Sequence, residues 1–419
     1  MTATGFQHTE VGVFPSDWKA VTIGELGPIS KGKGISRAEC RTGIIPCVRY
    51  GELYTDHDNY VKSFRSYISK EVASTSRKLQ YGELLFAGSG ETKEEIGKCV
   101  AFIDNCEAYA GGDIVIVTPD LDKYDPLFLG FLMNDSYVVR QKALRGQGDA
   151  VVHITGKTLS TVQLVVPPTI DEQRKIAKAM SDIDGLIDSL TKLIDKKKDI
   201  KIGTMQQLLT GEKRLAGVSE EWEKVLIGDL GKTYNGLSGK SAKDFGHGGA
   251  RYITFLNVLN NPIINTTLFE NVDVKPEETQ NAVKKGDLLF NTSSETPSEV
   301  GICAAMLEEV DNLYLNSFCF GFRPTERLDP LYMSYWFRSS KGRELMTMLA
   351  QGSTRYNLSK DNMLKSIICI PSKEEQVAIA SILTDMDTEI ASLEAKKEKF
   401  ELIKKGMMQE LLTGRVRLV

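Results

Sequence analysis

The chain has 419 residues, of which 41% are hydrophobic and 26% charged, and its formal net charge is −4. This length allows two or three domains, and the composition is that of an ordinary globular protein. With no apolar run of about 18 residues and no signal-peptide core, we expect a cytoplasmic protein without membrane partners. The slight negative charge argues only weakly against nucleic acid, because binding needs a local basic surface.

Residues 1–168 form a first block of short strands and one helical stretch. The helical stretch is predicted at residues 125–145 and ends at a glycine-rich loop, 146–148. A second polar loop, residues 88–93, follows the strand predicted with the clearest boundaries. The predicted strands, in which β-branched and aromatic residues lie between turn residues, are 20–23, 44–53, 83–86, 97–103, 113–117 and 161–166.

Residues 169–215 are predicted to form one long helix, which would act as a central spacer. It begins at a capping box, in which Thr169 and Glu172 each bond to the backbone N–H of the other. Apolar residues then recur at alternating spacings of four and three, a heptad seam that packs on one partner helix. The members of this seam are Ile176, Met180, Ile183, Ile187, Leu190 and Ile194.

The second half of the chain repeats the first. The helix recurs without a gap at residues 372–419, at an offset of 203, with the capping box at Ser372 and Glu375. The block recurs at residues 216–371, at an offset of 204, so that Gly-Glu-Leu-Leu-Phe at 82–86 becomes Gly-Asp-Leu-Leu-Phe at 286–290. The second seam consists of Ile379, Leu383, Met386, Ile390 and Leu393. The chain therefore arose by duplication, in the order block, helix, block, helix.

The two blocks share their glycines, prolines and apolar positions but differ in their loops. Lys-Gly-Lys at 31–33 corresponds to Gly-Leu-Ser at 236–238, and the loop at 148–153 corresponds to Gly-Ser-Thr-Arg-Tyr-Asn at 352–357. A common frame with different loops suggests two related sites that recognise different ligands.

We find no pattern of an enzyme active site or a metal site. Asn-Pro-Ile at 261–263 lacks the second proline and the aromatic residue of a methyltransferase motif, and the loop at 88–93 lacks P-loop spacing. Asp120 and Asp122 are crowded into one turn, which does not fit a nuclease motif. The four scattered histidines form no catalytic or metal-binding constellation, and the seven cysteines form no Cys-x-x-Cys pair. We therefore expect a chain with no catalytic residues and no cofactor.

Several motifs recur in the same order in both halves: Trp18 and Gly27 at the entry, Gly-[Glu/Asp]-Leu-Leu-Phe with its polar loop, Pro-x-x-[Asp/Glu]-Glu-Gln at the start of each helix, and Leu-Leu-Thr-Gly at its end. Gln-Gly-Ser-Thr-Arg-Tyr-Asn-Leu-Ser at 351–359 completes the set. With these motifs the whole chain resembles the DNA specificity subunit of type I restriction–modification systems. The loop at 148–153 departs from the pattern, because it lacks the equivalents of Arg355 and Asn357.

The resemblance implies an α+β protein with an internal pseudo-two-fold repeat. Two mixed α/β target-recognition domains, 1–168 and 216–371, would be separated by two long antiparallel helices, the central spacer at 169–215 and a C-terminal one at 372–419. Each domain would read one half of a split, asymmetric site in double-stranded DNA. The expected partners are DNA, two methyltransferase subunits and a translocase–nuclease subunit, and the chain itself would not be an enzyme.

Basic, amide and hydroxyl side chains of the loops are the candidates for DNA contact, because such groups bond to base edges and phosphates. They are Lys31, Lys33, Arg49, Ser89, Thr92, Lys93, Gln147, His153, Asn235, Lys240, Asn257, Asn291, Thr292, Ser293, Arg355, Tyr356 and Asn357. The same loops are compatible with plain hairpin turns, and five lysines between 192 and 201 with a solvated helix face. The alternative function is a scaffold whose two blocks bind other proteins.

Overall fold

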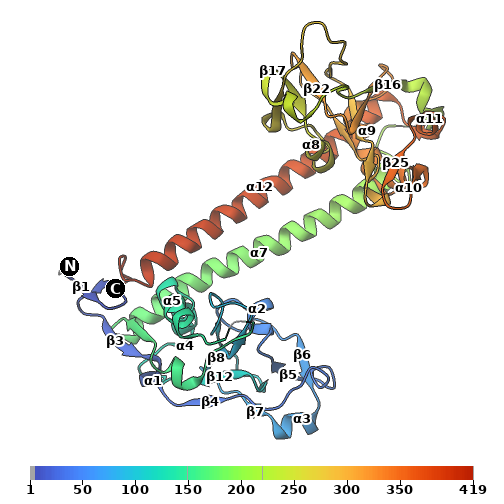
Figure 1. Cartoon of the computed structure of the whole chain (residues 1–419). Coiled ribbons are helices and arrows are strands. Elements are labelled where there is room, and N and C mark those ends of the chain that lie inside the picture. The colour runs from blue at the N-terminus through green and yellow to red at the C-terminus, as the bar shows by residue number, and fades with distance from the viewer. Residues whose placement is uncertain (1–4, 149, 219, 419) are drawn as a thin grey trace. The chain divides into compact units, whose positions relative to one another are not determined.

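The structure, a computed structural model, describes residues 5–148, 150–218 and 220–418. The chain divides into two compact units: unit 1 comprises Met1–Thr191 and Ala395–Val419, and unit 2 comprises Lys192–Glu394. Two long helices, α7 (Ile170–Leu209) and α12 (Lys373–Leu411), each contribute one half to either unit (Figure 1). Among the described residues, no helix is long and apolar enough to cross a membrane.

Unit 1 contains two four-stranded sheets. One has the order β10 (Cys99–Ala101), β8 (Leu84–Ala87), β12 (Ile114–Val117), β4 (Ile29–Lys31), and the other β6 (Ser66–Ile68), β5 (Ile45–Val48), β11 (Tyr109–Ala110), β7 (Arg77–Lys78). Its two-stranded pairs are β1 (Phe6–Thr9) with β2 (Gly12–Pro15), β3 (Lys19–Thr22) with β14 (Gln163–Val166), and β9 (Ser89–Gly90) with β13 (Val152–His153). The short helices are α1 (Ile23–Leu26), α2 (Glu52–Thr55), α3 (Lys70–Thr75), α4 (Pro126–Leu132), α5 (Ser136–Arg145) and α6 (Gly156–Leu159).

Unit 2 repeats this frame. Its four-stranded sheet has the order β16 (Gly231–Asn235), β23 (Cys319–Pro324), β19 (Leu288–Asn291), β21 (Cys303–Ala305). Two three-stranded sheets have the orders β18 (Phe269–Val272), β17 (Phe245–Ile253), β22 (Leu313–Leu315) and β20 (Ser293–Ser294), β25 (Tyr356–Leu358), β24 (Ala350–Gln351). A two-stranded sheet pairs β15 (Glu223–Leu226) with β26 (Ile367–Ile370). The helices are α8 (Phe255–Asn260), α9 (Pro330–Arg338), α10 (Ser340–Leu349) and α11 (Lys360–Leu364). Phe86 faces Cys99 in unit 1, and Phe290 faces Cys303 in unit 2, which confirms the offset of 204 residues.

Most of the predicted strands are confirmed within two residues, but two predicted elements are wrong. The strand predicted at 44–53 ends at Val48, because Glu52 opens α2 and its carboxylate accepts from the Arg49 N–H at 3.2 Å. The helical stretch predicted at 125–145 is two helices. Asp135 interrupts it, since its side chain accepts from the Tyr137 N–H at 3.0 Å and caps α5.

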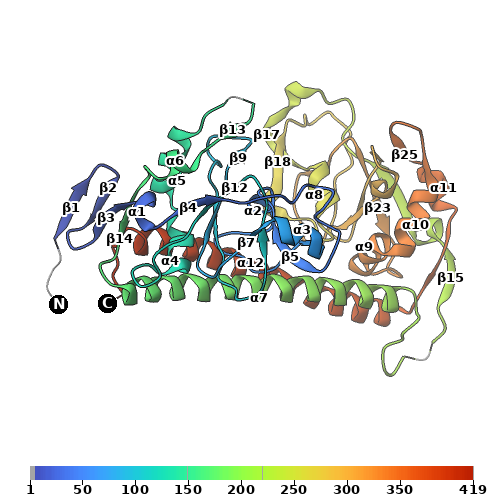
Figure 2. The ribbon, with the colours of Figure 1, turned by 90° about the horizontal axis from the view of Figure 1, so that it is seen from below.

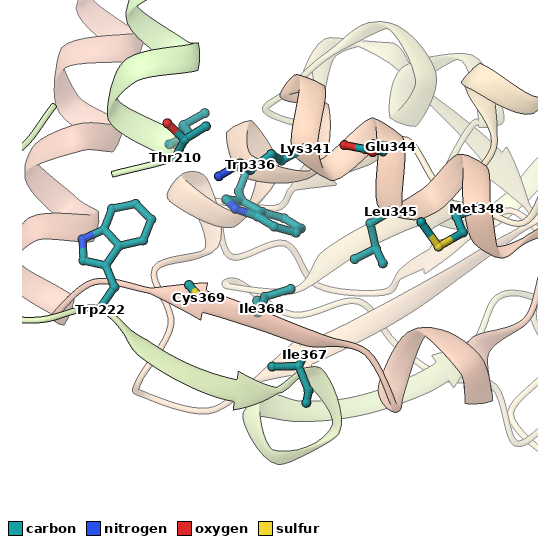
Figure 3. A pocket seen from close by; sticks show the side chains of 11 residues that line it. Thr210, Trp222, Trp336, Lys341, Glu344, Leu345, Met348, Ile367, Ile368 and Cys369 are labelled. Carbon is teal, nitrogen blue, oxygen red and sulfur yellow. The ribbon is translucent and has the colours of Figure 1, made fainter. Parts of the chain in front are cut away.

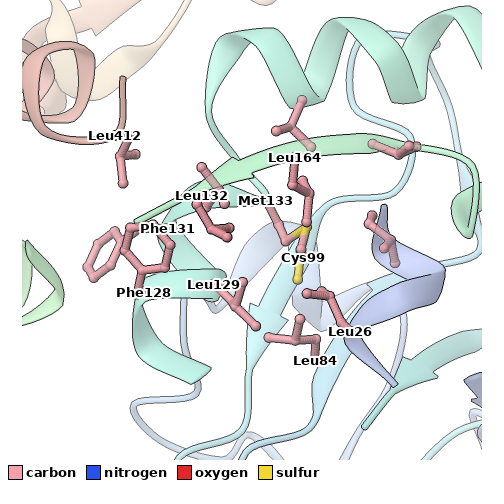
Figure 4. Packing of buried hydrophobic residues seen from close by; sticks show 14 of the residues in the cluster. Leu26, Leu84, Cys99, Phe128, Leu129, Phe131, Leu132, Met133, Leu164 and Leu412 are labelled. Atoms are coloured by element: carbon pink, nitrogen blue, oxygen red, sulfur yellow. The ribbon is translucent and has the colours of Figure 1, made fainter. Parts of the chain in front are cut away.

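The core of unit 1 includes residues from both ends of the chain (Figure 4). Leu84 and Phe128 of the domain pack in one cluster with Met180 of α7 and with Leu411 and Leu412, which follow it by more than two hundred residues. The predicted seam is therefore only partly a helix–helix contact. Its members nearest the start of each helix, such as Met180, lie in a domain core, whereas those nearer the middle remain buried or half-buried on the helix pair.

The end of each long helix is tied to the start of the other. Arg417, beyond α12, donates to the buried carboxylate of Glu172 at the start of α7, at 2.8 Å. Arg214, beyond α7, binds Glu375 at the start of α12 in the same way, with N–O distances of 2.8 and 2.7 Å. We call these two ion pairs the clasps. The predicted capping boxes are therefore half confirmed. The Thr169 and Ser372 hydroxyls accept from the N–H groups of Glu172 and Glu375, both at 3.4 Å, but the two carboxylates bind arginines and not the N–H groups of the caps.

Further ion pairs join the two helices along their length, and one of them occurs at equivalent positions in both units. In unit 1 the Lys404 ammonium lies 2.6 Å from the Asp184 carboxylate, and in unit 2 Lys201 binds Asp387 at the equivalent position. In each unit, the later residue of one helix pairs with the earlier residue of the other, in these pairs and in the clasps. The helices are therefore antiparallel within each unit. The lysines between 192 and 201 are thus partly engaged by α12.

Candidate nucleic-acid interface

In unit 1 a small sheet brings two predicted loops together (Figure 2). Ser89 of β9 pairs with His153 of β13, and the Ser89 hydroxyl lies 2.9 Å from His153 Nδ1. Gln147 joins them through two backbone bonds with His153, at 3.0 and 2.8 Å. Gln147 and His153 are exposed and Ser89 is half-buried, so three predicted DNA-contacting residues share one surface.

Lys31 and Lys33 lie where β4 ends, at the same end of their sheet as the end of β8. Val115 of β12 pairs with Phe86 on one side and with Lys31 on the other, so β8 and β4 end at the same edge. Lys33 continues from there and donates its backbone N–H to Ala110 at 3.0 Å. Of the other candidates of unit 1, Arg49 follows β5, and Thr92 and Lys93 are exposed in the turn after β9.

In unit 2 the small sheet is three-stranded and more basic. Asn357 of β25 lies between Ser293 of β20 and Gln351 of β24. Arg355 precedes β25 and is exposed, and its guanidinium lies over the Phe318 ring, 5.8 Å from the centroid. This surface therefore presents a fork donor, an amide and an aromatic ring, a set suited to bases and phosphates.

Three candidates of unit 2 lie inside the fold. The Asn291 side chain is fully buried and bonds to backbone groups of the following segment. Asn257 is 1% exposed and bonds both the N–H and the C=O of Asn265, at 3.0 and 2.9 Å. The Lys240 side chain is 4% exposed and pairs with Glu278 at 2.6 Å. Because their polar groups are already bonded, we leave these three out of the proposed DNA-contacting set.

The remaining candidates of unit 2 lie beside the small sheet or in it. Asn235, at the end of β16, is exposed and accepts from Lys360. Thr292 is half-buried and donates its N–H to the Phe318 carbonyl at 2.9 Å, and Tyr356 is half-buried in β25. Ser293 is 5% exposed.

Sequence reasoning identified Tyr356 but missed the other aromatic residues of the two sites. In unit 1 the Tyr54 hydroxyl donates to the Ser89 carbonyl at 3.1 Å, and burial raises the pKa of Tyr54, which keeps this donor protonated. Tyr50, one turn earlier, is 38% exposed, and in unit 2 Phe318 is 56% exposed. Their signal in the sequence was weak, because single aromatic residues in strand-forming segments usually belong to a core.

Unit 2 also contains an apolar cavity of about 330 Å³, lined by Trp222, Trp336, Met348 and Ile367 among others (Figure 3). The equivalent place in unit 1 is covered. There Phe14 of the β1–β2 hairpin packs edge-on against Tyr137, with centroids 5.2 Å apart, whereas the unit 2 residue at the position of Tyr137 is a lysine that lines the cavity. Within the described part of unit 2, no hairpin corresponds to β1–β2.

No group of three or more His, Cys, Asp or Glu side chains that could hold a metal ion occurs among the residues that the structure describes. The groups that converge on the two small sheets are hydroxyl, amide, imidazole and guanidinium groups, together with aromatic rings. They provide donors, acceptors and stacking surfaces, which is the chemistry of recognition.

Comparison with known proteins identifies relatives over the full length. The family described as "Type I restriction modification DNA specificity domain" matches residues 15–198 and again 219–402. The specificity subunit of the type I restriction enzyme MjaVIII of Methanocaldococcus jannaschii is 25% identical, over 96% of this chain and 94% of the relative.

Two solved structures share the fold. The type I restriction–modification S subunit from M. genitalium has a TM-score of 0.59 at 13% identity, covering 98% of this chain and 99% of that one. A chain from a study of complex assembly and conformational transition of the type I R-M system has a TM-score of 0.56 at 14% identity, covering 96% and 99%. The two domain matches together span most of the sequence. The chain thus belongs to the DNA specificity subunits of type I restriction–modification systems.

Proposed function

We propose that this chain is a non-catalytic subunit that reads a bipartite, asymmetric site in double-stranded DNA. The target-recognition domains, residues 1–168 and 216–371, each read one half, and the helical segments 169–215 and 372–419 act as spacers between them. One observation carries the proposal: the repeated frame holds two small sheets at equivalent places, and the side chains around them differ. Ser89 and Gln147 correspond to Ser293 and Gln351, but His153 stands where Asn357 stands, and Val151 stands where Arg355 stands.

We further propose that the chain docks two methyltransferase subunits and a translocase–nuclease subunit. The apolar cavity beside Trp222 and Trp336 supports a protein contact, since the same place in unit 1 is covered by apolar side chains of a hairpin. Exposed Met348 and Ile367, 74% and 65% accessible, extend this apolar surface. Large exposed apolar side chains around a cavity are typical of protein–protein contacts.

Exchanging one recognition domain tests the two-reader proposal. Residues 1–165 are replaced by those of a relative with a different site, and the methylated motif is mapped by methylome sequencing in cells with the cognate methyltransferase. We expect one half-site to change and the other to persist. A chimera that alters both half-sites, or neither, contradicts the proposal, provided that a reciprocal exchange of 216–371 assembles equally well.

Lengthening the helix pair tests its role as a spacer. Seven residues are inserted after Leu190 and seven after Leu393, which preserves the heptad register of both helices. Because each heptad adds ~10 Å at 1.5 Å per residue, we expect the unread spacer to grow by up to about three base pairs. Insertion of five residues at both places is the matched control, since it rotates the seam out of contact. An unchanged spacer in a fully active seven-residue variant contradicts the spacer role.

A further inference from the structure

Four arginines of unit 1 converge on one cavity of about 470 Å³. Arg37 and Arg41 come from the segment between β4 and β5, Arg49 follows β5, and Arg65 precedes β6. They are separated by up to 28 residues in the sequence, so that no motif unites them. We call this group the arginine cavity.

The carboxylates nearby do not neutralise this group. Glu52 is buried at the cavity wall, where it accepts from the Ser66 hydroxyl and from the Arg49 backbone N–H. Arg65 lies 3.4 Å from Asp56, at a largely exposed position. Within the described residues, Arg37 and Arg41 have no ion-pair partner, and the Arg49 guanidinium bonds only to the Cys40 sulfur, at 3.7 Å. Four guanidinium groups thus face two carboxylates, Glu52 and Asp56, and the cavity carries an excess of positive charge.

The arginine cavity adjoins the small sheet of unit 1. A second cavity, of about 450 Å³, shares Gly51 and Thr55 with it and extends past Tyr50 to Ser89. One continuous depression therefore runs from the loop pair of β9 and β13, past an exposed tyrosine ring, to the four guanidinium groups. A ligand that follows it first meets the polar groups of the loop pair and the carboxylates of Glu91 and Glu95, then an aromatic face, and then concentrated positive charge.

We propose that the arginine cavity binds a backbone phosphate of the DNA strand whose bases lie against the small sheet of unit 1. This rests on the proposed DNA-reading function. Guanidinium groups match the oxygens of a phosphate in fork geometry, and phosphate contacts set the register of a protein on DNA without reading sequence. The contact belongs to unit 1 alone. The strand pairing of unit 1 that joins Cys47 to Tyr109 recurs in unit 2 between Arg251 and Leu313, so Cys47 corresponds to Arg251. Two residues further on, Arg49 of unit 1 therefore corresponds to Ile253 of unit 2, which is buried.

The test measures the salt dependence of DNA binding. The full chain, assembled with its methyltransferase, is titrated with a duplex that carries the motif found by methylome sequencing, over a series of KCl concentrations. Arg37→Gln and Arg41→Gln, both at exposed positions, are compared with Arg174→Gln on the exposed face of α7. Each phosphate contact that is lost makes the slope of log K against log[KCl] less steep by about 0.9.

We expect the double variant Arg37→Gln, Arg41→Gln to lower the slope by about one and to weaken binding equally on cognate and altered duplexes, with the methylated motif unchanged. The Arg174→Gln variant keeps the slope of the unmodified chain. An unchanged slope in the double variant overturns the phosphate contact and leaves the reading function intact. A changed motif overturns it too, because the cavity would then read bases. Failure of the unmodified complex to prefer the motif contradicts the proposed function itself.

A second arm separates backbone phosphate from free phosphate. Thermal unfolding of the complex is followed with and without millimolar inorganic phosphate, for the unmodified chain and the double variant. We expect phosphate to change the unfolding temperature of the unmodified chain no more than that of the double variant, because a single phosphate lacks the neighbouring contacts of a bound duplex. A larger change in the unmodified chain, together with an unchanged KCl slope, would assign the cavity to a small anion and not to DNA.

Discussion

The two units satisfy the same pair of buried carbonyl groups with different cations. In unit 1 the ammonium of Lys142, on α5, donates to the carbonyls of Gly97 and Met133, at 2.6 and 2.8 Å. The Lys142 side chain is 1% exposed, and burial lowers its pKa to about 8.

In unit 2 the same carbonyls belong to Gly301 and Phe337, and they accept from Arg343 of α10, at 3.0 and 3.4 Å. The position of the unit 1 lysine is occupied by Met346, which is fully buried, and the position of the arginine is occupied in unit 1 by Val139. The cation has moved by one helical turn and its acceptors have not. The repeat therefore preserves a requirement, donors for two buried acceptors, and not the residue that meets it.

Removing a clasp should have the largest effect on this frame. We expect Arg417→Ala and Arg214→Ala each to lower the free energy of unfolding of their unit by about 3 kcal/mol, because each leaves a buried glutamate without its partner. The side chains of Glu172 and Glu375 are only 3% and 1% exposed. Chemical denaturation measures the loss. Arg415→Ala is the control, since its exposed pair with Glu410 should contribute less than about 1 kcal/mol. Equal losses at positions 415 and 417 would contradict the clasp.

The equivalent ion pairs between the helices should contribute differently to the stability of the two units, because their aspartates differ in burial. Asp184 is 2% exposed as a side chain and Asp387 is 33% exposed, although their lysine partners are equally accessible. We expect Lys404→Met to cost about 2–3 kcal/mol and Lys201→Met less than about 1 kcal/mol, because only the first leaves a fully desolvated carboxylate. Denaturation of the two single variants side by side measures the difference. A larger loss for Lys201→Met would mean that burial does not decide the strength of these pairs.

Transplanting the cation of unit 2 into unit 1 tests the comparison directly. Lys142→Met alone leaves two buried carbonyls without a donor, and we expect a loss of about 1–2 kcal/mol at neutral pH. Adding Val139→Arg supplies the donor from the position that unit 2 uses, so the double variant should recover most of the loss. Val139→Arg by itself serves as the control and should not stabilise. If the double variant is no more stable than Lys142→Met, the two arrangements are not interchangeable.

The unmodified chain and the double variant Lys142→Met, Val139→Arg should differ in pH dependence. Lys142 has a pKa of about 8 in the folded chain against ~10.4 when unfolded, so the unfolded state binds more protons between these values. Stability therefore rises as the pH increases through this window, by at most about 1.4 kcal/mol per pH unit, and falls as the pH drops towards 8. The double variant carries an arginine that does not titrate there, and its unfolding free energy should lack this component. If the unfolding free energies of the unmodified chain and the double variant change with pH in parallel, the assignment of this pH dependence to Lys142 is wrong.

The sequence predicted the repeat, the long helices and most strands, because these depend on regular spacing and on glycine and proline positions. It did not predict what Glu172 binds, since its partner Arg417 lies 245 residues away. It placed Asn291 and Lys240 among DNA candidates because of their residue type, whereas tertiary packing buries the Asn291 amide among backbone groups and pairs the Lys240 ammonium with Glu278. The arginine cavity was missed for the same reason: its members come together only when β5 and β6 pair.

The placement of Leu411 and Leu412 in the core of unit 1 has a consequence for folding during translation (Figure 4). Unit 2 is one continuous segment and is complete once residue 394 has been made, whereas unit 1, begun first, is completed last. At about 5–20 residues per second, the stretch from the start of α7 at Ile170 to Leu411 takes on the order of 10–50 s to synthesise. Throughout that time Ile176 and Met180 lack their partners from α12. Of the two units, the one that begins to leave the ribosome first therefore waits longer for its core, and during translation it has the greater need of a chaperone.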